Sequence, residues 1–130
     1  MNDNEPQHPL CEKYHIHVYF SKEQTDIARD LQQDMMDTFG DKIPHDSWHD
    51  KNVGPHTAPQ FLHLLPREHF EDIITWLNEH AEPLSILVHP NTGDELWDHT
   101  TGAVWIGEKR EIDTQILTNL KCRQKTGPKQ

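Results

Sequence analysis

The sequence has no long apolar run and holds only two cysteines in 130 residues. No stretch approaches the roughly 18 apolar residues that a membrane-spanning helix needs, and the polar, acidic start does not resemble a secretion signal. Cys11 and Cys122 lie near opposite ends, outside any C-x-x-C spacing, so we expect neither a disulfide scaffold nor a cysteine-based zinc site. These absences predict a soluble, unexported protein of the cytoplasm with no membrane partner.

Positive charge is also scarce, because the net charge is -10. Residues 1–107 carry 19 acidic side chains against 6 Lys and Arg, whereas residues 108–130 carry 3 against 6. The acidic body would repel nucleic acid phosphates, so we expect no nucleic acid partner. We interpret residues 108–130 as a basic, solvated C-terminal tail.

Aliphatic side chains are few, which limits the core. Leu, Ile, Val and Phe make up 28 of 130 residues, only just above the fraction of roughly 20% at which disorder becomes the default interpretation. The length suits one domain, and there is no internal repeat or long linker. We predict a flexible N-terminal segment over 1–12, a single domain over 13–107 and then the tail.

Hydrophobic periodicity predicts two helices and at least four strands. Residues 14–20 alternate, with Ile16, Val18 and Phe20 on one face and polar side chains on the other. A capping box at Ser21 begins a helix in which Ile27, Leu31, Met35 and Phe39 recur at four-residue spacing before Gly40. The other predicted elements are an edge strand at 42–53, strands at 60–65 and 84–89, an extra strand at 104–107, and a helix from Pro66 to before Pro83.

The order strand, helix, strand, strand, helix, strand indicates an α+β fold of the ferredoxin-like βαββαβ type. Two helices would cover one face of an antiparallel sheet, which leaves the other face for a partner subunit or a site. A homodimer is therefore expected. A Greek-key β fold is the weaker alternative, since both helical stripes are clear.

Histidine is the residue in surplus: there are 11, as many as leucine. Such a surplus indicates a pH-sensitive surface, a tag or a site. His15 and His17 project from the same strand face, roughly 7 Å apart, within reach of one metal ion. As an isolated pair, half-buried polar residues would be the more ordinary interpretation. His56 follows Gly54-Pro55, and His89 ends a predicted strand before a turn.

The first and fourth strands of this fold are antiparallel neighbours, so the register decides whether His89 meets His15 and His17. If the more apolar side of residues 84–89 faces the helices, His89 joins His15 and His17 on the open face of the sheet. His99 follows Asp98, a carboxylate that can orient an imidazole or bind metal itself. We interpret His63 as packed in the core. The remaining histidines, interpreted as surface residues, are His8, His45, His49, His69 and His80.

Several separated motifs follow one another along the chain. They are Tyr14-His-Ile-His-Val-Tyr-Phe20, Val53-Gly-Pro-His56, Ile86-Leu-Val-His-Pro-Asn-Thr-Gly93, Asp98-His-Thr100 and Ala103-Val-Trp-Ile-Gly107. In this order they resemble the DOPA 4,5-dioxygenase family, whose members open aromatic rings. The resemblance covers about residues 13–107, with Thr57 at a position where the family more often has proline. We expect Thr57 to alter the turn more than the chemistry.

The resemblance implies an extradiol dioxygenase that uses a non-haem ferrous ion, O2 and a catechol such as DOPA to give a muconic-semialdehyde-type product. His17, His56 and His89, one from each motif, are the expected metal ligands. His15 and His99 are the expected acid/base groups, because imidazole titrates near working pH.

Three alternatives stay open from the residues. The commonest non-haem iron shell has a carboxylate, so Asp94, Glu95 or Asp98 could replace one histidine. The same imidazoles suit zinc, either as a substitute in purified protein or in a hydrolase or metal-binding protein. The third alternative is a non-enzymatic, dimeric ferredoxin-like domain. No motif identifies a residue that would bind a carboxylate of the substrate. Lys51 and Arg67 are candidates only because they lie near the motifs in the sequence.

Overall fold

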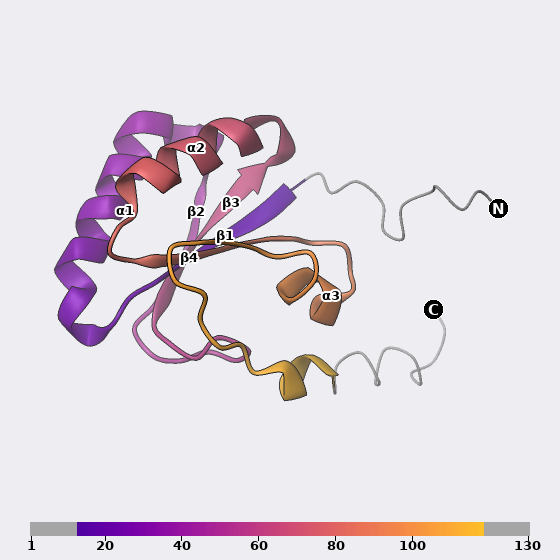
Figure 1. Ribbon diagram of the computed structural model, residues 1–130. Coiled ribbons are helices and arrows are strands. Elements are labelled where there is room, and N and C mark those ends of the chain that lie inside the picture. Colours follow the sequence, from indigo (N-terminus) through magenta and orange to yellow (C-terminus); the bar gives the residue numbers. More distant parts are fainter. Residues whose placement is uncertain (1–12, 119–130) are drawn as a thin grey trace.

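The computed structural model describes residues 13–118, which form a five-stranded antiparallel sheet with two helices packed on one side (Figure 1). The predicted flexible segment at 1–12, with His8 and Cys11, lies outside the described residues, as do residues 119–130 of the predicted tail. No helix among the described residues is long and apolar enough to span a membrane.

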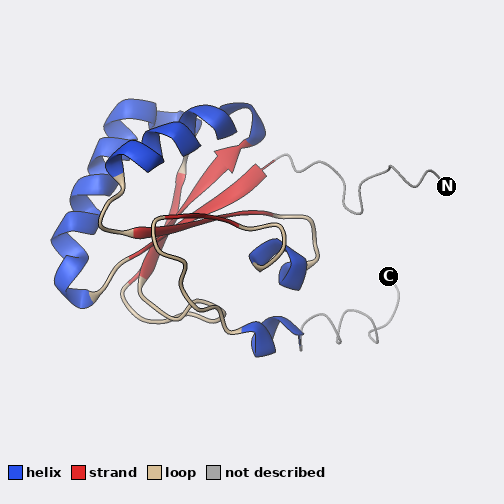
Figure 2. Cartoon of the chain, viewed as in Figure 1, coloured by secondary structure: helices blue, strands red, loops and turns tan. Residues whose placement is uncertain are grey.

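The strand order in the sheet is β2-β3-β1-β4-β5, with every neighbouring pair antiparallel. The first four strands have the order of a ferredoxin-like sheet, which confirms the predicted fold class, and the expected extra strand extends the sheet beyond β4 (Figure 2). The strands are β1 (Lys13–Tyr19), β2 (His45–His49), β3 (Gln60–Pro66), β4 (Ser85–Pro90) and β5 (Val104–Ile106), and the helices are α1 (Thr25–Phe39), α2 (Phe70–His80) and α3 (Glu95–His99).

Helix α1 begins after the expected capping box and ends at Gly40, where φ is +54°. Its buried face carries Ala28, Leu31 and Met35, whereas Ile27 is 43% exposed. The prediction of Ile27 in the apolar stripe was therefore wrong. The physical reason is that residues four apart advance about 40° beyond a full turn, so a strict four-residue repeat leaves the core face within two steps.

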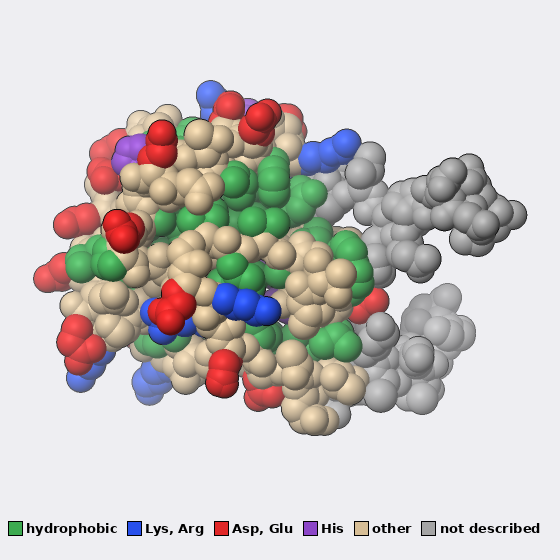
Figure 3. Space-filling view, in the orientation of Figure 1, with side chains coloured by type: hydrophobic (Ala, Val, Ile, Leu, Met, Phe, Trp, Pro, Cys, Tyr) green, Lys and Arg blue, Asp and Glu red, His purple; other side chains and the backbone are tan. Residues whose placement is uncertain are grey.

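The core lies between the sheet and helices α1 and α2. Ile16, Val18, Phe61, Ile86 and Val88 point into it from the sheet and are each at most 1% exposed. Figure 3 shows acidic side chains over the outer side of these helices, which fits an amphipathic helical layer.

The histidines outside the motifs have varied surroundings. His63 lies on the helix side of β3, fully buried, and its Nδ1 donates to the backbone oxygen of Ile43 at 2.8 Å. His45 and His80 are exposed, as predicted. His49, at the end of β2, and His69, in the turn before α2, are half-buried rather than fully exposed.

The chain after β5 returns over the polar side of the sheet. The backbone N–H of Asp113 donates to the carbonyl of Pro55 at 2.8 Å, and the Thr57 hydroxyl donates to the carbonyl of Glu111 at 2.7 Å. Leu117 is 1% exposed. Residues 111–117 therefore pack beside the loop that carries His56, rather than standing free in solvent as expected for the tail (Figure 1).

Candidate metal centre

The register of the central strands brings three predicted site histidines to the open sheet face. In the β1–β4 pair, His15 lies directly opposite His89, and His17 lies opposite Leu87. Because opposite residues of antiparallel strands project to the same face, His15, His17 and His89 share the face away from α1 and α2. The condition left open by the sequence, that the apolar side of β4 faces the helices, is met by Ile86 and Val88.

Two further histidines reach this face from outside the sheet. His56 sits in a turn closed by its own N–H donating to the carbonyl of Val53 at 2.9 Å, and it pairs with Ile112. His99 ends the short helix α3, whose first turn is capped by Asp94 accepting from the N–H of Trp97 at 3.1 Å. The ring centroids of His17 and His56 lie 4.1 Å apart, as do those of His89 and His99.

The structure thus brings together all five histidines singled out in the sequence. Four of them, His17, His56, His89 and His99, are only 3–7% exposed, while His15 is half-buried at the edge. Among residues 13–118, two sets of three have ring nitrogens within 4.8 Å of one another. The sets are His15, His17 and His89, and His17, His56 and His99. His17 belongs to both sets and is the centre of the cluster.

Hydrogen bonds to the Nδ1 atoms fix which nitrogen each ring offers. Nδ1 of His17 donates to the Gln60 side-chain oxygen at 2.9 Å, that of His89 to the Pro90 carbonyl at 2.7 Å, and that of His99 to the Glu95 carbonyl at 2.8 Å. A carbonyl only accepts, so each Nδ1 carries the proton and each Nε2 keeps its lone pair. A histidine that binds metal is held in this way, by a carbonyl on its other nitrogen.

His56 has a side-chain partner instead of a carbonyl. Its Nδ1 is hydrogen-bonded to the Tyr19 hydroxyl at 2.5 Å. For His56 to offer Nε2 to a metal, Nδ1 must carry the proton and donate it to the hydroxyl oxygen. Burial raises the pKa of Tyr19, which keeps its hydroxyl protonated and able to fill this role.

The electrostatics of the cluster favour neutral rings. Burial, followed by the neighbouring imidazoles, lowers the pKa of His17 and His89 well below its usual value, and that of His56 to about 4. The pKa of His15 is lowered by burial too, although nearby carboxylates such as Asp46 oppose the shift. Metal ions bind the neutral imidazole, so these rings are in the form that a metal requires at neutral pH.

One distance tests whether the donor set fits a metal. The Nε2 atoms of His17 and His89 lie 3.0 Å apart, although neither carries a proton when both Nδ1 atoms donate. Two lone pairs at that separation repel each other unless a cation lies between them. Two nitrogen ligands at right angles, each about 2.1 Å from one ion, are about 3.0 Å apart. The residues present therefore fit a divalent metal.

The three nearby carboxylates have other partners. Asp98 is fully buried and accepts from both the N–H and the hydroxyl of Thr92, at 3.0 and 2.6 Å. Asp94 caps α3, and an oxygen of Glu95 lies 3.7 Å from Nδ1 of His99. Both nitrogen sets described above consist of histidines alone. The geometry thus favours an all-histidine shell over the carboxylate alternative.

A cavity of about 580 Å³ opens beside the cluster. His99 forms part of its wall, together with Trp105, Lys109, Arg110 and Ile112. A cavity of 300–1,000 Å³ is typical for small-molecule ligands. Neither Lys51 nor Arg67, suggested by proximity in sequence, is among its lining residues; both are exposed.

Several residues of this site were not predicted from the sequence. Tyr19 and Gln60 did have a signal. Tyr19 shares the polar face of β1, and Gln60 begins an apolar strand, where a buried glutamine side chain needs a hydrogen-bond partner. Trp105 lies on β5 within one of the family motifs, although no role was assigned to it. Lys109 and Arg110 had no local signal, because they reach the cavity only where the chain folds back after β5, which is a tertiary feature.

Comparisons with known proteins agree with the motifs. A protein from Botryotinia fuckeliana, described as an uncharacterized 21.2 kDa protein, is 34% identical over 119 residues, which cover 83% of this chain and 64% of that protein. The DOPA 4,5-dioxygenase of Amanita muscaria is 29% identical over 128 residues, covering 91% of this chain and 54% of that protein. The chain thus spans between half and two thirds of the length of these two relatives.

A solved structure has the same fold. The crystal structure of a protein from Nostoc punctiforme, described as a "putative dioxygenase", matches with a TM-score of 0.79 and 30% identity, covering 85% of this chain and 94% of that one. The family model described as the Dopa 4,5-dioxygenase family matches residues 14–116, beyond residue 107 where the resemblance was expected to end. The chain belongs to the Dopa 4,5-dioxygenase family.

Proposed function

We propose that this chain is a metal-dependent extradiol dioxygenase that opens the ring of a catechol. The carbon–carbon bond beside the two hydroxyl-bearing carbons breaks, and both atoms of O2 enter the product, giving a muconic-semialdehyde-type compound. The observation that carries the proposal is the convergence of buried, neutral imidazoles with free Nε2 atoms beside a cavity of ligand size. Family membership supports the reaction class.

His17, His56 and His89 would hold the metal, with ferrous ion as the expected species. This set is neither of the two nitrogen groups as a whole: it combines the shared member, His17, with His89 from the first group and His56 from the second, one histidine from each sequence motif. When bound, the ion would supply open coordination positions for the catechol oxygens and for O2. Gln60 and the Pro90 carbonyl orient the rings of His17 and His89, and Tyr19 orients His56.

His99 is assigned to proton transfer because it is the cluster histidine that lines the cavity. Its Nδ1 is held by the Glu95 carbonyl, so Nε2 is free to take a proton from a catechol hydroxyl and return it during ring opening. His15 lies at the outer edge of the cluster, 5.0 Å from the His89 ring between centroids, where it can act as a second base.

The proposal is tested by oxygen uptake and product absorbance. Protein loaded with ferrous ion should consume O2 with DOPA or another catechol and form a coloured product, and His17→Ala should abolish both uptake and metal binding. His80→Ala is the matched control, since His80 is exposed on α2 on the other side of the sheet. No uptake across a panel of catechols, with iron bound, would disprove the dioxygenase.

Two more variants separate metal ligands from proton-transfer groups. His89→Ala should lower the bound metal, whereas His99→Ala should retain the metal and lose most of the ring opening. The reverse result would assign the metal to His17, His56 and His99, the second nitrogen group. Tightly bound zinc that cannot be exchanged for an active iron form would favour the zinc alternative.

A further inference from the structure

Two cationic side chains line the cavity beside the histidine cluster, in a chain that has few of them. Lys109 and Arg110 form part of its wall, although the chain has only 12 Lys and Arg and a net charge of -10. No carboxylate among residues 13–118 forms an ion pair with either side chain. Glu111, the third charged residue of the wall, leaves the cavity with an excess of positive charge.

Arg110 is fixed in place on the open sheet face. Its Nε donates to the Ser85 hydroxyl at 3.1 Å, and Ser85 lies directly opposite Tyr19 in the β1–β4 pair. With Nε engaged, the two terminal nitrogens of the guanidinium remain to bind another group. A guanidinium binds a carboxylate through two parallel hydrogen bonds, a geometry that lysine cannot reproduce.

The apolar part of the wall is suited to an aromatic ring. Trp105 is half-exposed, and its ring stacks on Tyr19 with 5.7 Å between centroids and 22° between planes. Trp105 lines the cavity together with His99 and the two cations. An aromatic ligand with a short acidic side chain would contact histidine, indole and guanidinium together.

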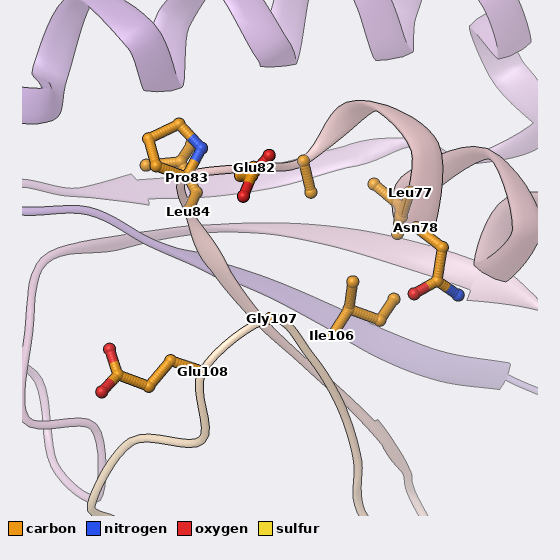
Figure 4. A pocket seen from close by; sticks show the side chains of 9 residues that line it. Leu77, Asn78, Glu82, Pro83, Leu84, Ile106, Gly107 and Glu108 are labelled. Atoms are coloured by element: carbon orange, nitrogen blue, oxygen red, sulfur yellow. The ribbon is translucent and has the colours of Figure 1, made fainter.

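A second cavity in the domain has the opposite character. It measures about 450 Å³ and lies between the end of α2, the turn that leads to β4, and the end of β5 (Figure 4). Its charged lining residues are Glu82 and Glu108, with no Lys, Arg or His in the wall. Positive charge is thus not a general property of the cavities, and it is found where the histidine cluster opens.

We infer that Lys109 and Arg110 form an anion subsite that selects aromatic substrates carrying a carboxylate. This inference rests on the proposed function, because it assigns the substrate class of that same site. Arg110 binds the carboxylate through its terminal nitrogens, and Lys109 adds a second positive charge. The selected substrates are small catechols with an acidic side chain, in preference to neutral catechols of similar size.

A binding experiment tests the subsite without any turnover. Isothermal titration of the metal-loaded full chain would compare 3-(4-hydroxyphenyl)propionate with 4-ethylphenol, two phenols that differ by one carboxylate. Wild-type protein should bind the acid more tightly, and Arg110→Gln should reduce the ratio of the two affinities by about tenfold. Lys109→Gln should reduce it too, in case Arg110→Gln fails to fold. Arg67→Gln is the matched control and should leave the ratio unchanged, because Arg67 is an exposed arginine outside the cavity wall.

The same comparison in oxygen uptake uses 3-(3,4-dihydroxyphenyl)propionate and 4-ethylcatechol. The ratio of their kcat/KM values should fall in Arg110→Gln, and Arg110→Lys should restore part of it. Unchanged ratios in both cavity variants would overturn the subsite even if ring opening is observed. A carboxylate preference lost in these variants, with no turnover of any catechol, would instead support the subsite and refute the dioxygenase.

Discussion

Replacing Gln60 with leucine should weaken metal binding although Gln60 is not itself a ligand. Gln60 is 2% exposed, and its side-chain oxygen accepts from Nδ1 of His17, which is 5% exposed, at 2.9 Å. Without this acceptor, a buried N–H has no partner, at a cost of about 1–3 kcal/mol. The His17 ring can also move its proton to Nε2, which would block the nitrogen needed for the metal.

The expected magnitude follows from the role of Gln60 as a positioning residue. Losing such a partner weakens metal affinity by roughly 10- to 100-fold. At a metal concentration of about 100 times the wild-type Kd, binding stabilises the fold by about 2.7 kcal/mol, which would fall to between about 1.4 and 0.4 kcal/mol in the variant. In a chain of 130 residues, about 1 kcal/mol shifts Tm by roughly 4 °C. The metal-induced rise in Tm should therefore drop to about half or less.

The assay is competition with a chromophoric chelator, supported by Tm with and without metal. Gln32→Leu is a matched control, because Gln32 also lies beside a buried histidine, His63, with 3.3 Å between their Nε2 atoms, but on the helix side of the sheet. Gln60→Glu keeps an acceptor and should retain the affinity. If Gln60→Leu folds normally and binds metal as tightly as the wild type, the assignment of His17 as the central ligand is wrong.

Two further predictions concern stability. Burial lowers the pKa of His63, so the unfolded chain binds a proton that the folded chain does not; stability is complete above the unfolded pKa of 6.5 and falls as the pH drops below it. His63→Leu should reduce the change of unfolding free energy with pH by the contribution of up to one proton, which is about 1.4 kcal/mol per pH unit. Urea titrations between pH 7.5 and 5 measure this slope. Equal slopes in the variant and the wild type would contradict the assignment. Asp98→Ala removes the acceptor of both Thr92 hydrogen bonds and should lower the unfolding free energy by about 2–4 kcal/mol. The turn before α3 should also become disordered, which NMR would detect as faster amide exchange. A loss of unfolding free energy below about 0.5 kcal/mol would show that Asp98 does not hold this turn.

The fold was predictable because its elements follow simple periods. Alternation gave the two faces of β1, and a capping box with a glycine stop gave α1. Two details were not predicted correctly. Ile27 is exposed, because a four-residue spacing does not stay on the core face of a helix, and residues 111–117 are packed through tertiary contacts. A return of the chain over the sheet leaves no mark on local sequence, so the sequence alone predicts a tail where residues 111–117 pack.

The candidate site was predictable to the level of its histidines but not of their roles. His15, His17, His56, His89 and His99 were found from faces, turns and family motifs, and the structure gathers them. Which of them share a metal depends on distances between ring nitrogens, which no sequence pattern carries. Lys109 and Arg110 were not predicted either, because they lie directly before the packed segment 111–117 and reach the cavity through the same return of the chain.

The position of His89 is determined by the core. Ile86 and Val88 face the helices and are fully buried or nearly so, and the alternation of a strand then places Leu87 and His89 on the open face. A one-residue slip of β4 would turn both aliphatic side chains toward the open face, where full exposure would cost up to about 1.5–3 kcal/mol for each, and would move His89 into the core. Since that penalty is a large fraction of the stability of a small domain, the hydrophobic core holds His89 opposite His15 before any metal binds.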